Sequence, residues 1–193
     1  MYASKLNAIH GSRTGRILRY NPSNGEIDIL ATGIFFANGI SINKDESYLV
    51  IAETFGARLL KYHLKGDKEG VMDVLIDNLV GYPDGLDCSS KTGNCYAVIP
   101  SAKPSIINVI NAFPPMLDLV LRSLLMIVPK SLAPEVNPIG CVVEVDPETG
   151  ELIQTYQDPK GDDIAALHGV TFNNEKLYFG SLHNDFIGVY DLK

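Results

Sequence analysis

The chain has 193 residues, a formal charge of −7 and three cysteines, and 46% of its residues are hydrophobic. This composition is that of a globular protein with enough length for a core. The acidic balance and the absence of clustered Lys and Arg argue against a nucleic-acid partner, and three cysteines exclude a multi-disulfide scaffold. No sequence stretch reaches the roughly 18 apolar residues of a membrane-spanning helix, and the first residues lack the apolar segment of a secretory signal.

The first predicted element is a β-hairpin over residues 6–30. Polar and apolar residues alternate from Gly15 to Tyr20, a Pro/Gly-containing turn follows at 21–25, and the alternation resumes at Glu26. This pattern is typical of two strands joined by a tight turn.

A polar residue followed by glycine then recurs three times, as Asn38-Gly39, Asp84-Gly85 and His168-Gly169. Each step opens an alternating segment, a short polar turn and a second apolar stretch. The first two steps are 46 residues apart, and the second interval is also 46 if residues 102–139 are an insertion of 38. That period suits a propeller blade of about 40–45 residues. The three polar residues are therefore expected at the start of successive innermost strands, near the axis, where an active site would form.

The repeats predict an all-β fold, a partial β-propeller domain over residues 1–193. It comprises the outer half-blade 6–30, whole blades over 34–79 and 80–158, and a last blade of three strands over 164–193. A propeller closes into a ring of 4–8 blades, and an open set leaves unpaired edges. We therefore expect the C-terminal part of a longer propeller, in which about three blades pair with missing blades or with another copy.

The insertion 102–139 breaks the strand pattern. Residues 104–111 and 116–128 suit helices, and the polar residues of the second, Asp118, Arg122 and Ser123, fall on one narrow face. We expect this apolar helix to be a lid over the pocket, to make a peripheral contact with a membrane surface through 116–128, or to be a plain packing insertion.

Other side chains admit simpler interpretations. Cys88 and Cys95 face each other across a predicted hairpin, either as two packed thiols or as a bridge formed in an oxidising compartment. Glu53 ends a strand and is expected in a structural ion pair, with Arg58 as a candidate partner. His183 is interpreted as a solvated loop residue or as a residue of the pocket rim.

Five segments carry a resemblance to a known family: 36–40, 51–54, 57–62, 77–85 and 177–182. They resemble the strictosidine synthase-like proteins, a group that includes the adipocyte plasma membrane-associated protein and has paraoxonases and gluconolactonase/regucalcin proteins as wider relatives. The resemblance runs from about residue 15 to 192. It implies a six-bladed propeller with roughly the first two and a half blades absent, and a place in the endomembrane or secretory pathway.

The resemblance also implies a calcium site. In the paraoxonase and gluconolactonase relatives, the equivalents of Asn38 and Asp84 ligate a central calcium, which takes six to eight oxygen ligands. Bound calcium would polarise an ester or lactone carbonyl and stabilise the developing oxyanion. Further ligands in those relatives come from blades outside this sequence. The structural alternative is that both residues serve turns.

Strictosidine synthase itself joins an amine to an aldehyde and depends on a glutamate, at a position that here is His168. This departure argues against that lyase chemistry. His168 is a candidate general base, because its unperturbed pKa lies near neutrality, or a hydrogen-bonded axial residue without a catalytic task. The leading hypothesis is an arylesterase- or lactonase-like hydrolase of a small molecule, assisted by calcium at Asn38 and Asp84. The alternatives are a carbon–nitrogen lyase and a non-catalytic binding platform at a membrane.

Overall fold

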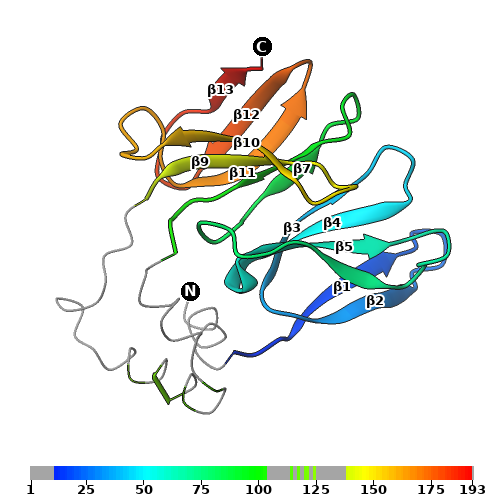
Figure 1. The fold of residues 1–193 in the computed structure, drawn as a ribbon. Helices are drawn as coiled ribbons and strands as arrows, with labels where there is room; N and C mark the ends of the chain where they lie inside the picture. Colours follow the sequence, from blue (N-terminus) through cyan, green and yellow to red (C-terminus); the bar gives the residue numbers. More distant parts are fainter. Residues whose placement is uncertain are drawn as a thin grey trace.

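A computed structural model of the chain describes residues 11–103, 114, 117, 120, 121, 124 and 138–192. The described residues form thirteen strands in four antiparallel sheets, drawn in sequence colours in Figure 1. The all-β fold predicted from the repeats is confirmed.

The first sheet is a two-stranded hairpin of β1 (Gly15–Tyr20) and β2 (Ile27–Ile34). Its turn follows from local chemistry: the Asn21 side chain accepts the Ser23 amide, and Gly25 adopts a positive φ of 76° that glycine tolerates without strain.

The second sheet has the order β3-β4-β5-β6. Its strands are β3 (Ala37–Ile42), β4 (Tyr48–Glu53), β5 (Arg58–His63) and β6 (Met72–Ile76), with a short 3-10 turn, η1 (Thr54–Gly56), between β4 and β5. The apolar runs in β4 and β5 are buried on both faces, as expected for central strands with a sheet on either side.

The third sheet, β10-β9-β8-β7, is interrupted in the sequence by the insertion. Its strands are β7 (Leu86–Cys88), β8 (Cys95–Val98), β9 (Gly140–Val145) and β10 (Leu152–Asp158). Strands β8 and β9 pair directly, with Cys95 opposite Val145, although they are far apart in the sequence. Cys88 and Cys95 lie opposite each other in the register and form a disulfide bond, which decides between the two alternatives left open by the sequence.

The last sheet is three-stranded, with the order β11-β12-β13. Its strands are β11 (Leu167–Asn173), β12 (Lys176–Ser181) and β13 (Gly188–Asp191).

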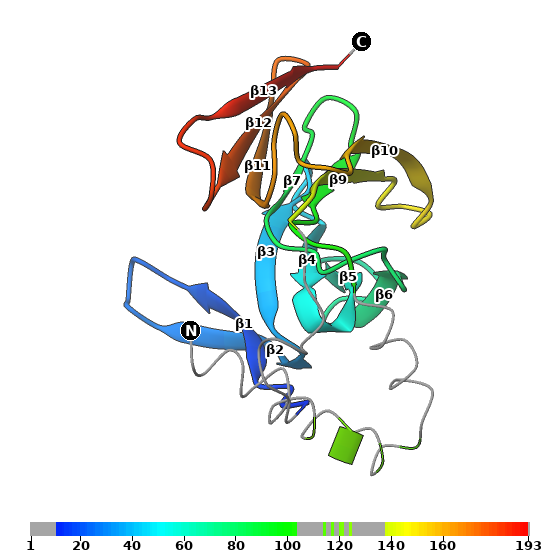
Figure 2. The same ribbon diagram turned by 90° about the vertical axis from the view of Figure 1, so that its left-hand side faces the viewer.

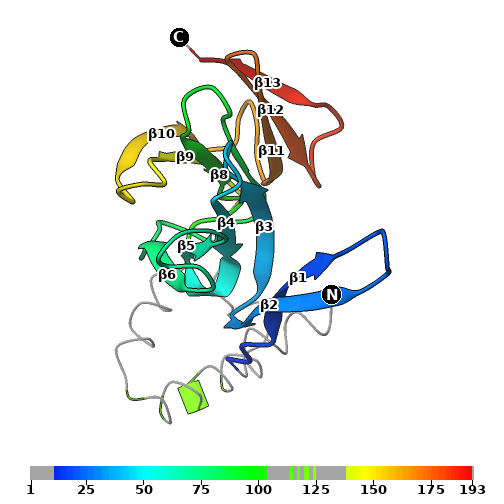
Figure 3. The same cartoon turned by 90° about the vertical axis from the view of Figure 1, so that its right-hand side faces the viewer.

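The sheets fan out from the three inner strands β3, β7 and β11, as the two side views show (Figures 2 and 3). Apolar side chains fill the spaces between neighbouring sheets. One core cluster, around Val50, Leu59 and Val143, joins the second and third sheets, and another, around Val98, Val142 and Leu177, joins the third and fourth. Hairpin β1–β2 packs through Ile17 and Ile34 on the second sheet.

The predicted helix over 104–111 lies outside the described residues. Within 116–128, the described positions Leu117, Val120, Leu121 and Leu124 are all helical. Among the described residues, no helix is long and apolar enough to cross a membrane.

Candidate functional site

The three polar–glycine steps meet where the inner strands lie side by side. The Gly39 amide donates to the Asp84 carbonyl oxygen at 3.0 Å, and the Gly85 amide donates to the His168 carbonyl oxygen at 3.1 Å. These backbone bonds bring Asn38, Asp84 and His168 into one group, which we call the axial cluster. The sequence placed these three residues at equivalent positions, and the structure brings them together.

Asp84 is the centre of the axial cluster. Its mostly buried carboxylate accepts a hydrogen bond from Asn38, and its Oδ2 atom lies 3.9 Å from Nε2 of His168. Burial raises the pKa of Asp84, while the nearby His168 and the Asn38 hydrogen bond act in the opposite direction. Burial therefore disfavours the ionised carboxylate, and a cation that binds next to it would stabilise the ionised form.

His168 is held in one orientation by its backbone surroundings. Its Nδ1 atom lies 2.6 Å from the Ala166 carbonyl oxygen, which can only accept, so the Nδ1 proton is donated there. Neutral His168 therefore carries its lone pair on Nε2, the atom that faces Asp84.

A second histidine borders the axial cluster. The ring of His183 stacks on that of His168, with centroids 6.5 Å apart and planes inclined by 12°. The Ser181 hydroxyl accepts the His183 amide at 3.0 Å, which holds this loop against the end of β12. His183 is an exposed loop residue that lies beside the cluster, so both interpretations of its sequence describe it. The only sequence signal for this location was that His183 directly follows a predicted strand.

Neighbouring groups position the segment before Asp84. The Thr54 hydroxyl donates to the Pro83 carbonyl oxygen at 2.8 Å. Next to Thr54, the buried carboxylate of Glu53 pairs with Arg58, as predicted, and also with Arg13 at 3.0 Å and the Phe35 amide at 2.7 Å. The sequence missed the Arg13 and Thr54 contacts, because both join residues distant in the chain.

The axial cluster has the right chemistry for calcium but supplies only part of a coordination sphere. Asn38 and Asp84 offer an amide and a carboxylate oxygen, the hard ligands that calcium prefers. Among the described residues, no group of three or more His, Cys, Asp or Glu side chains is arranged to hold a metal ion. The donors fit the ion in kind, and further oxygens must complete its shell.

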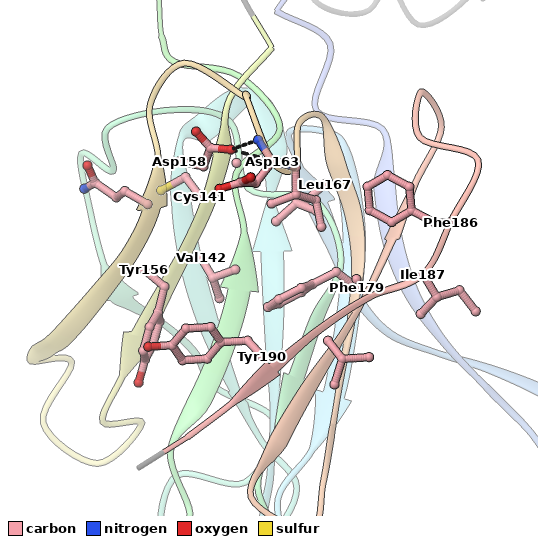
Figure 4. Close-up of a pocket in the computed structure, with 15 residues that line it drawn as sticks. Cys141, Val142, Tyr156, Asp158, Asp163, Leu167, Phe179, Phe186, Ile187 and Tyr190 are labelled. Atoms are coloured by element: carbon pink, nitrogen blue, oxygen red, sulfur yellow. Dashed lines mark hydrogen bonds between the residues drawn. The ribbon is translucent and has the colours of Figure 1, made fainter.

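A separate hollow of about 490 Å³ lies between the third and fourth sheets (Figure 4). Its walls are mainly apolar and include Phe179, Tyr156 and Tyr190, and the free Cys141 also lines it. The carboxylate of Asp158, at its upper end, already accepts hydrogen bonds from backbone amides of the following loop. None of the axial cluster residues lines this hollow, so the two features are distinct.

Comparison with known sequences gives the following relatives. The strictosidine synthase family model matches residues 3–67. Protein STRICTOSIDINE SYNTHASE-LIKE 3 of Arabidopsis thaliana is 29% identical over 97% of this chain and 47% of its own length. The adipocyte plasma membrane-associated protein of Salmo salar is 30% identical over 92% of this chain and 42% of its own length. The chain thus spans about half the length of the curated relatives it matches.

Comparison with solved structures gives propellers. A luciferin-regenerating enzyme aligns with a TM-score of 0.57 and 16% identity, over 90% of this chain and 47% of that one. A calcium-binding protein, regucalcin, from Agrobacterium tumefaciens aligns with a TM-score of 0.53 and 15% identity, over 90% and 48%. A gluconolactonase from Xanthomonas campestris also gives a TM-score of 0.53, with 13% identity over 85% and 40%. These similarities establish the fold alone.

Proposed function

The chain is related to the strictosidine synthase-like proteins, and we propose that it is a hydrolase of an ester or lactone carbonyl, assisted by calcium at the axial cluster. The observation that carries this proposal is the convergence of Asn38, Asp84 and His168 at the starts of three adjacent inner strands. Because the chain spans about half of its relatives' length, the activity of a whole protein is part of the proposal.

Asn38 and Asp84 would hold the ion. Asp84 contributes a carboxylate whose ionised form is poorly solvated, and Asn38 an amide oxygen once its side chain turns from Asp84 to the ion. Bound calcium supplies a Lewis acid that polarises the substrate carbonyl.

His168 would take the proton from the attacking water. Its fixed Nδ1 proton leaves Nε2 free to accept a proton, as a general base requires. The Ala166 carbonyl then stabilises the imidazolium, because it already accepts the Nδ1 proton.

The names of the structural neighbours support the choice of reaction. One is described as a gluconolactonase and another as a calcium-binding protein. Their sequence identity to this chain is too low to assign roles to its residues from theirs.

The test is hydrolysis of an aryl ester and of a series of lactones, with calcium or with excess chelator. Turnover should require calcium and be lost in Asp84→Asn. His168→Gln should lower kcat by about 10²–10⁴-fold, the usual contribution of a general base. Asp185→Asn, which changes an exposed loop carboxylate, is the charge-matched control and should behave as wild type. Turnover that survives chelation or Asp84→Asn, or no turnover of any substrate, contradicts the proposal.

A membrane platform is a second candidate, carried by the described part of the insertion. Leu117, Val120, Leu121 and Leu124 follow the i, i+3, i+4, i+7 spacing of one helix face, and three of them are exposed. Binding to phosphatidylcholine vesicles should be lost in Leu124→Glu and kept in Leu152→Glu, which places the same charge at an exposed apolar position of β10. Equal binding by both variants argues against this candidate.

A further inference from the structure

The inner strands are joined by a contact that repeats from sheet to sheet. In its first part, the glycine of one polar–glycine step donates its amide to the carbonyl oxygen of the next step's polar residue, Gly39 to Asp84 and Gly85 to His168. A Cβ atom on Gly39 would lie 2.4 Å from the Asp84 carbonyl oxygen, and one on Gly85 would lie 2.5 Å from that of His168. Glycine is required at both positions because two backbones approach each other closely.

The second part of the contact lies three residues further along each strand. The Ser41 hydroxyl accepts the Cys88 amide at 3.1 Å, and the Asp87 carboxylate accepts the Phe172 amide at 2.9 Å. The same positions are used both times. The acceptor side chain lies three residues after the polar residue of its own step, and the donor amide lies four residues after the polar residue of the next step. Both parts run in the same direction along the chain.

The third step carries both groups needed to continue this contact. Gly169 and Thr171 correspond to Gly39 and Ser41, and Thr171 is exposed. A Cβ atom on Gly169 would meet nothing within 4 Å, unlike those on Gly39 and Gly85. Val189, which lies on the same face because it pairs with Tyr178 opposite Thr171, is also exposed. We call this surface of the fourth sheet the tail face.

The opposite end of the fan carries the complementary groups. By the same register, these are the carbonyl of Asn38 and the amide of Ile42. Ile40 and Ile42 are 51% and 48% exposed, whereas Leu86 and Val170, the equivalents of Ile40, are 7% and 8% exposed because the preceding sheet covers them. We call this surface, with the exposed apolar side of hairpin β1–β2, the head face.

We propose that the tail face binds the head face of a second copy of this chain. Gly169 donates its amide to the Asn38 carbonyl of the second copy, and Thr171 accepts the amide of that copy's Ile42. Because each copy carries both faces, the contact forms twice around a two-fold axis and closes. Three inner strands from each copy make six, the number of blades in this fold.

The shared sheets gain their full number of strands in this assembly. The second and third sheets of the chain each have four strands. A shared sheet reaches the same number when β11 and β12 of one copy combine with hairpin β1–β2 of the other. In the single chain the four-residue strand β13 pairs with β12 at the edge that β1 would take, so the proposal requires β13 to leave that edge. Exposed apolar residues of the hairpin, including Leu18 and Ile29, are covered by this step.

The assembly also extends the axial cluster, a consequence that rests on the proposed function. Two copies place two sets of Asn38 and Asp84 around one axis, which brings the oxygen ligands nearer to the six to eight that calcium takes.

The test is the mass of the intact chain in solution, measured by light scattering in chelator so that calcium and activity play no part. Wild type should be dimeric. Gly169→Ala should be monomeric with an unchanged circular dichroism spectrum, because its Cβ clashes only across the interface. Gly180→Ala is the matched control: it lies opposite Gly169 on β12 and its Cβ also meets nothing within 4 Å. Its equivalent in the second sheet, Ala52, is buried with a Cβ atom in place, so this variant should remain dimeric.

Thr171→Val gives a second, milder change. It keeps the shape and removes the acceptor from both symmetric contacts, so the dissociation constant of the dimer should rise by about a hundredfold, corresponding to two hydrogen bonds. A monomeric wild type at high concentration, an open series of larger assemblies, or a Gly169→Ala variant as dimeric as Gly180→Ala overturns the proposal. These outcomes leave calcium-dependent hydrolysis to its own test.

Discussion

Glu53 is the side chain whose removal should destabilise the fold most. Its carboxylate is 1% exposed and is satisfied by Arg58, by Arg13 and by the Phe35 amide. Glu53→Ala leaves Arg58 and a buried amide without their acceptor, and breaking such a buried pair costs about 3–5 kcal/mol. Arg58→Ala removes one charge-assisted hydrogen bond and should cost about 1.5–3 kcal/mol. Arg13, with a side chain 50% exposed, should contribute less than about 1 kcal/mol because solvent screens it.

The assay is urea unfolding followed by circular dichroism, since the chain contains no tryptophan. Asp28→Ala is the control: Asp28 pairs with Arg19 on the surface, and its loss should change the free energy of unfolding by about 0–0.5 kcal/mol. The order Glu53, Arg58, Arg13, Asp28 is the expected result. A Glu53→Ala variant within about 1 kcal/mol of wild type refutes the reasoning that a buried, fully paired carboxylate anchors these strands.

Further predictions concern Asp84, the thiols and Gly39. The raised pKa of Asp84 means that the folded chain binds this proton more tightly than the unfolded chain. Its contribution to stability is therefore complete below the unfolded pKa of about 3.9 and is lost as pH rises through the folded value. In chelator, Asp84→Asn should raise the melting temperature at pH 7 and flatten that part of the pH profile. Without reductant, the unfolded chain should show one titratable thiol, Cys141, because Cys88 and Cys95 are bridged; three would contradict the disulfide. In the folded chain Cys141 should react slowly, since burial raises its pKa to about 11. Gly39→Ala should lower the free energy of unfolding by about 1–3 kcal/mol through its clash with the Asp84 backbone, and a neutral effect would argue against the close approach of β3 and β7.

The sequence predicted the parts of the fold that repeat. Polar–glycine steps followed by alternating residues located the inner strands, because glycine and period-two alternation are local signals of close approach and of strands. The same register predicted that Asn38, Asp84 and His168 would meet. The interruption at 102–139 was visible because it breaks a regular spacing.

Contacts between distant residues had no such signal. The Lys61 ammonium crosses from the second sheet to the third, donating to the Pro147 carbonyl at 2.9 Å and to Glu148 at 3.0 Å. Asp87 looked like an ordinary polar residue of a strand, yet its carboxylate joins β7 to both neighbouring inner strands. Which polar side chain accepts a hydrogen bond from which amide depends on how the sheets stack, and the sequence of one strand does not contain that information.

Thermal unfolding of wild type and Asp84→Asn, each with calcium and with excess chelator, tests the central claim most directly. Ligand that binds only the folded state stabilises it by about 2.7 kcal/mol at a hundred times its Kd. The account predicts that calcium raises the melting temperature of wild type and leaves that of Asp84→Asn unchanged. Equal shifts in both proteins, or none in wild type, would contradict a calcium site at the axial cluster.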